Sequence, residues 1–309
     1  MNITLEALQI LDAIDRKGSF AAAAMALDKV PSAITYSIRK LEEDLDVLLY
    51  DRRGHRAKLT PAGTELLSQG RHLLNAAQEL ENRVKRTATG WESELRIVLD
   101  GIIQFDHLLP LIKEFEQQNC GTRLRFSQEI LSGVWESMMT GRADLAIGAA
   151  YDGPDTIRMQ GDLQTRVLGA IDWVFAVAPD HPLARADEPL STELIQQYRA
   201  IAIGDTGRSL PTMTAGLLNG QDTLTVPSVE AKLAAQLSGL GCGHLPRAIA
   251  TRYLQSHQLI EKRTDHQRPT ETCCYVWRQT NKGKALHWFL QKLKEPVVHS
   301  MLLGNNSHA

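Results

Sequence analysis

The chain has 309 residues, of which 43% are apolar and 23% are charged, and its formal net charge at pH 7 is −2. That length is enough for two or three domains, and the near-neutral charge taken alone argues against a nucleic-acid binder. No run of about 18 apolar residues suggests a membrane span. The N-terminus does not have the pattern of a secretory signal, and four cysteines are too few for a disulfide framework, so we expect a cytoplasmic protein.

Three helices are predicted near the N-terminus. The first covers residues 4–16, with Thr4 as its N-cap and Gly18 at its end. Ser19 can cap the second helix, FAAAAMAL, whose small side chains allow another helix to cross closely. A tight connection, DKVP, then leads into a third helix, VPSAITYSIRKLEEDL.

The third helix has two different faces. Its apolar residues at positions 34, 38, 41 and 45 fall on one side, and Ser32, Tyr36 and Arg39 fall on the other. The next segment, VLLYDRRGHRAKLT, predicts two short strands around a basic turn at residues 53–55. This order of elements predicts a winged helix-turn-helix, which places one element in a DNA groove and another on the flanking backbone.

The outward residues of this region are candidates for DNA contact. Arg39 can donate to both acceptors of a guanine, while Tyr36 or Ser32 can contact a phosphate or a thymine methyl group. The other basic side chains are suited to phosphates, which position a protein without specifying sequence. The alternative is a solvated basic surface. The predicted DNA-binding residues are Lys29, Pro31, Ser32, Thr35, Tyr36, Arg39, Lys40, Arg52, Arg53, His55 and Arg56.

A long helix with a heptad repeat is predicted over residues 61–89. One stripe repeats every seven residues and favours pairing with a second copy of the chain. Leu67 and Leu74 form a separate stripe that could rest on the N-terminal domain. The alternative is a single helix lying on its own core. The predicted dimerisation residues are Leu66, Gly70, Leu73, Ala77, Leu80 and Val84.

Beyond residue 90 the pattern alternates between strands and helices, which is typical of parallel α/β units. One series runs from LRIVLDG to ADLAIGA, and a second begins at IDWVFAVAP. A strand over residues 273–278 is expected to return to the first series. The last helix is expected over residues 284–294, with a mobile tail after Pro296. Two α/β lobes with crossing connections imply a cleft between them.

These segments resemble the bacterial LysR-type transcriptional regulators. The first 65 residues resemble the DNA-binding domain of that family in GSFAAAAMAL and PSAITYSIRKLEEDLDVLLYDRRGHRAKLTPAG. Further matches are SGVWESMMTGRADLAIG, APDHPLA and LSGLGCGHLP, so the resemblance covers roughly residues 3–296. It implies a winged helix-turn-helix, a dimerising linker helix, a periplasmic-binding-protein-like effector domain and a homotetramer. Family members often have Gln in place of Pro31 and Arg or Gln in place of Tyr36, so no base preference is carried over.

The expected fold is therefore α+β. A winged helix-turn-helix occupies residues 1–60, a linker and dimerisation helix residues 61–90, and a two-lobed α/β effector-binding domain residues 91–309. Lobe I is expected over about residues 91–165 and 267–296, and lobe II over about residues 166–266.

Ligands of such domains lie at the carboxyl ends of strands and at helix N-termini. The carboxylates Asp100, Glu129 and Asp205 would suit an amine or a nucleoside-like ring, on which Trp135 could stack. The alternative is that these acids cap helices or pair with arginines such as Arg208 and Arg125. The predicted effector-binding residues are Asp100, Ile102, Gln104, Glu129, Ile130, Gly133, Trp135, Gly148, Ala149, Asp205, Thr206, Arg208 and Ser228.

Catalytic motifs are absent from the sequence. There is no G-x-S-x-G, no phosphate-binding glycine loop and no H-E-x-x-H, so we expect neither an enzyme nor a cofactor or metal site. The sequence predicts a regulator that binds promoter or operator DNA, a small-molecule effector and a second copy of itself, but no membrane. The alternative is a solute-binding or enzymatic α/β protein with an N-terminal interaction module. A nucleoid-type architectural protein would leave the cleft-forming lobes without a role.

Overall fold

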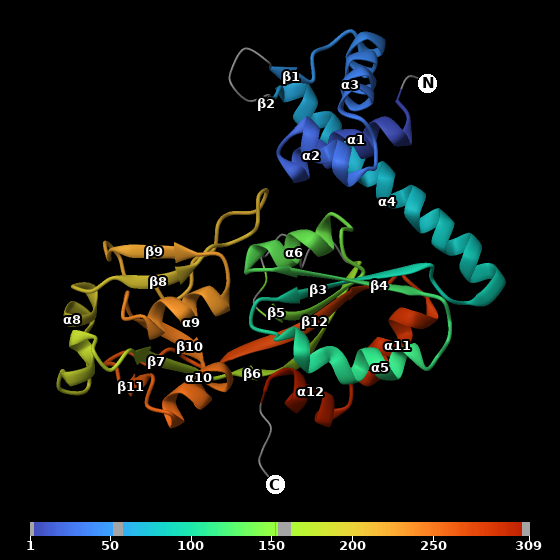
Figure 1. Cartoon of the computed structure of the whole chain (residues 1–309). Coiled ribbons are helices and arrows are strands. Elements are labelled where there is room, and N and C mark those ends of the chain that lie inside the picture. Colours follow the sequence, from blue (N-terminus) through green and yellow to red (C-terminus); the bar gives the residue numbers. More distant parts are fainter. Residues whose placement is uncertain (1–2, 52–57, 152, 154–161, 305–309) are drawn as a thin grey trace. The chain divides into compact units, whose positions relative to one another are not determined.

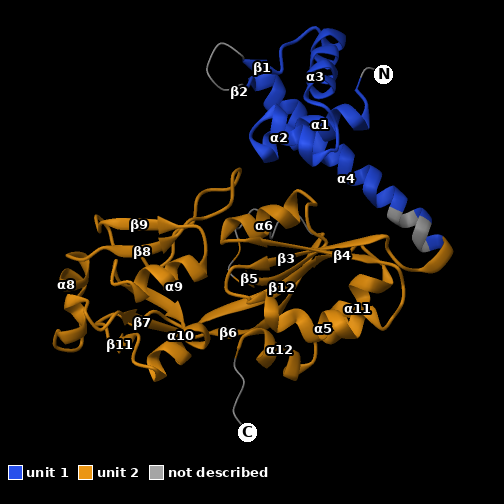
Figure 2. Ribbon diagram, in the orientation of Figure 1, with its two compact units in different colours: residues 1–87 blue, residues 88–309 orange. Residues whose placement is uncertain are grey.

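The computed structural model describes residues 3–51, 58–151, 153 and 162–304 (Figure 1). The chain divides into two compact units, residues 1–87 and residues 88–309 (Figure 2). Among the described helices, none is long and apolar enough to cross a membrane.

The N-terminal unit begins with three helices, α1 (Leu5–Lys17), α2 (Phe20–Ala26) and α3 (Pro31–Leu45). Thr4 Oγ1 accepts the N–H of Ala7 at 3.1 Å, and Ser19 Oγ accepts the N–H of Ala22 at 3.1 Å. Gly18 ends α1 at φ 73°, in the left-handed region that glycine adopts readily. The predicted caps of both helices are confirmed, and so is Pro31 at the start of α3.

The apolar face of α3 forms the centre of this unit. Ile34 and Ile38 are fully buried among residues of α1 and α2. The small residues Ala23 and Ala24 of α2 are buried there too, which lets the helices approach closely. After α3, β1 (Tyr50–Asp51) pairs antiparallel with β2 (Lys58–Leu59), so the two strands of the predicted hairpin are confirmed.

The helix α4 (Pro61–Thr89) begins directly after the hairpin. Its first turns pack on the N-terminal unit, because Leu67 is buried in the core. Arg71 fixes the contact further along: its Nε lies 2.8 Å from Asp12 Oδ1, and its Nη2 lies 2.7 Å from Asp15 Oδ2. The predicted stripe that rests on the N-terminal domain is therefore present at Leu67.

Lobe I of the second unit contains a five-stranded sheet in the order β4-β3-β5-β12-β6. Its strands are β3 (Glu94–Asp100), β4 (Arg123–Glu129), β5 (Leu145–Ala150), β6 (Leu163–Ile171) and β12 (Glu271–Arg278). β3 runs parallel to β4 and β5, whereas β12 runs antiparallel to β5 and β6. The predicted return of the strand at 273–278 to the first lobe is confirmed. The strand β6 was not predicted from the sequence. Because it pairs with β12, lobe I extends to Ile171 and not only to about residue 165 as expected.

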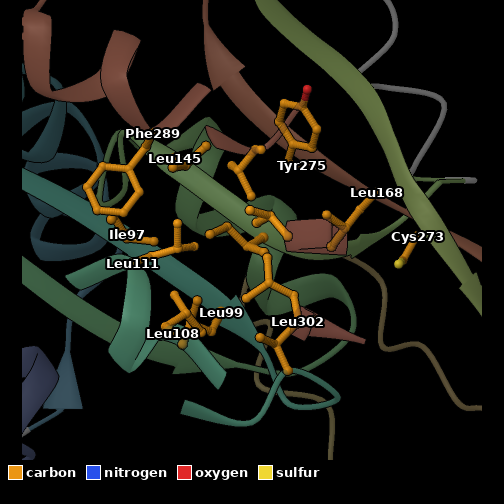
Figure 3. Packing of buried hydrophobic residues seen from close by; sticks show 14 of the residues in the cluster. Ile97, Leu99, Leu108, Leu111, Leu145, Leu168, Cys273, Tyr275, Phe289 and Leu302 are labelled. Atoms are coloured by element: carbon orange, nitrogen blue, oxygen red, sulfur yellow. The ribbon is translucent and has the colours of Figure 1, made fainter. Parts of the chain in front are cut away.

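Helices surround this sheet and bury its apolar side chains, as the cluster containing Leu145, Tyr275 and Phe289 illustrates (Figure 3). Lobe I includes the 3-10 helix η1 (Phe105–Leu108) and the helices α5 (Leu109–Glu116), α6 (Ser132–Met139), α11 (Lys284–Lys292) and α12 (Pro296–Leu302).

The prediction of a mobile tail after Pro296 is wrong, because α12 packs into the core of lobe I. Val298 and Leu302 are buried in that core, and the next residue, Leu303, is buried with them. His107 Nδ1 lies 3.3 Å from the carbonyl oxygen of Leu302. Apolar residues four apart on a short helix thus supply enough buried area to hold the segment in place.

Lobe II contains two smaller sheets. β7 (Trp173–Val177) lies between the antiparallel strands β10 (Gly243–Pro246) and β11 (Ile260–Lys262), and β8 (Ala200–Ile203) runs parallel to β9 (Thr223–Val226). A bridge between Ala200 and Cys242 links the two sheets. The covering elements are η2 (Pro182–Arg185), α8 (Thr192–Gln196), α9 (Val229–Leu237) and α10 (Arg247–Gln255).

Candidate functional site

The outward face of α3 is exposed, as its sequence pattern predicts. Tyr36 is 67% exposed, and Arg39 and Lys40 are also exposed, one turn further along the helix. Pro31 and Ser32 are exposed at its start. This face therefore offers a phenol, a guanidinium and an ammonium group to the solvent.

Two of the predicted DNA-binding residues, Lys29 and Thr35, already form hydrogen bonds with other groups of the protein. Lys29 Nζ lies 2.6 Å from Glu6 Oε1, and this hydrogen-bonded ion pair lowers the pKa of Glu6. The half-buried Thr35 donates its hydroxyl proton to the carbonyl oxygen of Pro31 at 3.0 Å. Phosphate binding by Lys29 would therefore compete with Glu6. The predicted contacts in the turn of the hairpin, Arg52, Arg53, His55 and Arg56, lie outside the described residues.

A buried carboxylate joins α3 to the hairpin. Glu42 Oε1 accepts the N–H groups of Leu49 and Tyr50 at 2.9 and 3.1 Å. Glu42, Leu49 and Tyr50 are all buried. Leu49 directly precedes β1, and Tyr50 is its first residue. The carboxylate on α3 therefore fixes the position at which the hairpin begins relative to this helix.

The predicted pairing seam of α4 divides into two parts. Its beginning is covered by the chain's own N-terminal unit: Leu66 is half-buried, and a side chain on Gly70 would come within 2.7 Å of Leu8 Cδ2. The structure thus corrects the expected place of Gly70, which is a close contact between α4 and α1. Further along, Leu73, Leu80 and Val84 are 53%, 55% and 64% exposed, and Ala77 is half-buried.

A cavity of about 100 Å³ lies between lobes I and II. Since one water needs about 10–15 Å³ on this scale, there is room for several waters or a compact ligand. Four of the predicted effector residues line it: Asp100, Ile102, Ile130 and Gly148. The cavity is otherwise largely apolar, and its remaining polar groups come from β12, the segment just before β12 and lobe II.

Asp100 lies at the carboxyl end of β3. Its carboxylate accepts the N–H of Ile102 at 3.1 Å and also the N–H of Leu131. Burial outweighs these hydrogen bonds and raises the pKa of Asp100 to about 7. Asp100 is therefore partly protonated near neutral pH, which weakens its negative charge in the cavity.

Three basic residues of the cavity were missing from the sequence prediction. Lys232 on α9 is only 7% exposed, and burial lowers its pKa to about 8. His244 on β10 has a buried Nδ1 with no hydrogen-bond partner among the described residues, and burial lowers its pKa to about 4. The Cζ of Arg268 lies 3.5 Å from the centre of the Trp173 ring, and its Nη2 lies 2.7 Å from Glu271 Oε1. Lys232 could have been found, because it falls on the inward face of α9 with Val229, Leu233 and Gln236.

Asp205 lies at the junction of the lobes but does not line the cavity. The hydroxyl of Ser132 donates to its carboxylate, with Oγ 2.8 Å from Oδ1 and 2.7 Å from Oδ2. The carboxylate also accepts the N–H of Gly207 at 2.9 Å and the N–H of Met213 at 2.7 Å. Burial raises the pKa of Asp205, but these hydrogen bonds, together with one from the N–H of Gly133, outweigh burial and lower it. Asp205 of lobe II therefore holds the start of α6 in lobe I.

Thr206 and Arg208 extend this contact between the lobes. The N–H of Ile130 donates to Thr206 Oγ1 at 2.8 Å, and Gly133 lies so close that a side chain on it would collide with this oxygen. The backbone N–H of Arg208 donates to Glu136 Oε2 at 2.6 Å. We call the contact formed by Ser132 and Glu136 of α6 with residues 205–209 the α6 latch.

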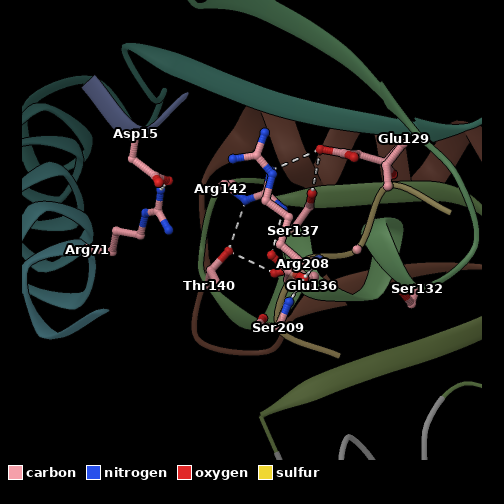
Figure 4. A network of polar contacts seen from close by, with 12 residues as sticks. Asp15, Arg71, Glu129, Ser132, Glu136, Ser137, Thr140, Arg142, Arg208 and Ser209 are labelled. Carbon is pink, nitrogen blue, oxygen red and sulfur yellow. Dashed lines mark hydrogen bonds and ion pairs between the residues drawn. The ribbon is translucent and has the colours of Figure 1, made fainter. Parts of the chain in front are cut away.

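The last predicted carboxylate, Glu129, pairs within lobe I. Arg142 Nη1 lies 2.9 Å from Glu129 Oε1, and its Nη2 lies 3.6 Å from Glu136 Oε1 (Figure 4). The alternative interpretation of these acids therefore describes Glu129 and Asp205 better, because each is occupied by protein donors. The arginine that pairs with Glu129 is Arg142, which the sequence-based alternative did not include.

The remaining predicted effector residues also lie away from the cavity lining. Trp135 is buried in lobe I among residues such as Val134 and Met138, which corrects the expectation that it stacks on a ligand. Ala149 is fully buried, and Ser228 Oγ accepts the N–H of Ala231 as the N-cap of α9. Gln104 lines a separate groove. Among the residues that the structure describes, no cluster of His, Cys, Asp or Glu side chains could hold a metal ion.

Comparison with known proteins gives a consistent result over nearly the whole chain. Residues 88–297 match the family described as LysR substrate binding domain, and residues 5–64 match that described as bacterial regulatory helix-turn-helix protein, lysR family. The uncharacterized HTH-type transcriptional regulator YeeY of Escherichia coli K12 is 42% identical over 304 residues, covering 98% of this chain and 96% of YeeY.

Solved structures with a similar fold include two complexes. Full-length CbnR complexed with target DNA has a TM-score of 0.56 at 18% identity, covering 94% of this chain and 99% of CbnR. Full-length LysG from Corynebacterium glutamicum with bound effector Arg has a TM-score of 0.52 at 21% identity, covering 97% of this chain and 98% of LysG.

Proposed function

The chain belongs to the LysR family of transcriptional regulators, and we propose that it recognises its operator with the exposed face of α3 and responds to an effector in the cavity between the lobes. It is a regulator and not an enzyme. The observation that carries the DNA-binding proposal is the exposed row Ser32, Tyr36 and Arg39, opposite the buried row of the same helix. The complex of CbnR with target DNA supports this use of the fold.

Arg39 is the residue we assign to base recognition. Its guanidinium is exposed and can donate two parallel hydrogen bonds to O6 and N7 of a guanine. A bidentate pair of this kind contributes about 1–3 kcal/mol of discrimination. Tyr36 can contact a thymine methyl group or a phosphate. Lys40, Lys29 and the basic residues of the hairpin turn would bind phosphates and set the salt dependence of binding.

The exposed part of α4 would join two copies of the chain. Leu73, Leu80 and Val84 leave apolar surface uncovered on a helix whose first turns already pack on the N-terminal unit. Pairing of two such helices would bury this surface and bring two copies of α3 to successive major grooves, about 34 Å apart. A homotetramer would then form from two dimers in the cytoplasm, where the operator is found.

The effector would act through the relative position of the lobes. The cavity is lined by both lobes, and the α6 latch also joins them. A ligand shifts such an equilibrium only by its difference in affinity between the two arrangements. Binding of the effector would therefore change lobe geometry, and through it the spacing of the DNA-binding units.

Fluorescence anisotropy with a labelled operator fragment tests the assignment of α3. Arg39→Ala should weaken binding to the operator by about 5- to 150-fold, the equivalent of about 1–3 kcal/mol. Arg263→Ala is the matched control, because Arg263 is an exposed arginine of lobe II. If Arg39→Ala binds the operator as tightly as Arg263→Ala, the assignment fails.

A further inference from the structure

We propose that the effector is a compact organic acid, whose anionic group binds Lys232 and whose apolar body fills the rest of the cavity. This inference rests on the proposed function, in which the cavity is the effector site. It replaces the amine or nucleoside-like ligand suggested by Asp100, Glu129 and Asp205, because only Asp100 lines the cavity.

Lys232 is the main evidence for an anionic group. Its side chain comes from α9 and lines the cavity, although the residue is only 7% exposed. No hydrogen bond or ion pair to its ammonium group is found among the described residues. Burying an ammonium without a counter-ion destabilises a fold, and a leucine or methionine would pack there without that penalty. An anionic ligand would supply the missing partner.

Two more polar side chains line the same cavity from other elements, and the imidazole of His244 can donate to an anion in its Nδ1–H tautomer. His244 on β10 has a buried Nδ1 without a hydrogen-bond partner among the described residues. The Cζ of Arg268 lies over the Trp173 ring, and its Nε and Nη2 donate to Glu271 Oε1. Its Nη1 has no hydrogen-bond acceptor within the part of the chain that the structure describes, so it can serve a ligand. Because the three side chains come from α9, β10 and the segment before β12, their convergence does not follow from one helix face.

The remaining lining defines the body of the ligand. Ile102, Ile130 and Ile171 lie on one side of the cavity, and Ile203, Val229 and Leu245 belong to lobe II. These side chains offer no hydrogen bonds, so the part of the ligand that they contact is apolar. The amine predicted from the carboxylates would instead add a third positive charge beside Lys232 and Arg268, where repulsion would oppose binding.

The experiment compares matched probes on the full-length protein by thermal shift and calorimetry. The probes are benzoate and 3-methylbutanoate, their neutral amides, and benzylamine with 3-methylbutylamine. At least one acid should raise the melting temperature, and its amide and amine should bind at least tenfold more weakly. Equal or tighter binding of the amides or amines would overturn the proposal, and so would no binding of either acid.

Variants locate the acid within the cavity. Lys232→Met should weaken acid binding at least tenfold, while Lys232→Arg should recover part of the affinity. Lys262→Met is the control, because Lys262 belongs to the same lobe but contacts the Ala186 carbonyl oxygen and Glu188 instead of the cavity. Acid binding that is the same in Lys232→Met and wild type would contradict the proposal. Operator binding by the wild-type protein is measured in parallel, so that failure of the ligand class is distinguished from failure of the proposed function.

Discussion

Glu42→Ala should destabilise the N-terminal unit and weaken DNA binding, although Glu42 itself is buried. The substitution removes the acceptor of two buried N–H groups, those of Leu49 and Tyr50, at 2.9 and 3.1 Å. A buried donor that loses its partner costs about 1–3 kcal/mol, so the two together cost about 2–6 kcal/mol. A unit of this size is stable by only about 4–13 kcal/mol, so the loss is a large part of the total.

Hydrogen exchange followed by mass spectrometry measures this effect directly. The amides of Leu49 and Tyr50 should exchange much faster in Glu42→Ala, and operator affinity should fall because the hairpin is no longer fixed beside α3. Glu42→Gln is the matched control, since its amide oxygen can still accept both hydrogen bonds and should keep most of the protection. Equal protection of these amides in Glu42→Ala and wild type would refute the reasoning.

Three further predictions concern the cavity, the α6 latch and α4. Burial lowers the pKa of Lys232 from 10.5 to about 8, so its charged form destabilises the folded state by about 3 kcal/mol at pH 7. Lys232→Met should therefore be more stable than wild type in urea at pH 7, and the difference should shrink between pH 8 and 10.5. The pKa of Asp205 is below its usual 3.8, so the stability from its hydrogen bonds is fully present above about pH 4 and is lost as the pH falls further. The free energy of unfolding of Asp205→Asn, measured in urea as the pH is lowered, should therefore lack this loss of stability below pH 4. Leu80→Glu should prevent pairing through α4 and shift the proposed tetramer toward dimers in sedimentation equilibrium, and an unchanged tetramer would exclude the exposed part of α4 as the interface.

Local signals account for what the sequence predicted well. Thr4, Gly18 and Ser19 act on backbone groups within four residues of themselves, so the ends of α1 and α2 could be predicted without knowledge of the rest of the chain. The two faces of α3 could be predicted from helical spacing alone. The apolar side chains of Ile34 and Ile38 have to be buried against another element, whereas Tyr36 can remain in solvent. The same reasoning predicted that Leu67 would pack on the N-terminal unit.

Contacts between distant segments explain what the sequence did not predict. The pairing of Ser132 with Asp205 joins residues 73 positions apart, and nothing in either segment indicates the other. Asp205 and Asp100 both follow a strand, and both accept backbone N–H groups, yet only Asp100 lines the cavity. Gly70 sits at a heptad position, but its neighbour is Leu8, since the N-terminal unit covers that part of α4.

Selection of bound fragments from a sheared genomic library tests the central claim most directly. The protein should retain a small set of fragments that share a two-fold symmetric sequence at moderate salt, and Arg39→Ala should lose that preference while still binding DNA weakly. Retention of all fragments in proportion to their length, by wild type and variant alike, would contradict the account.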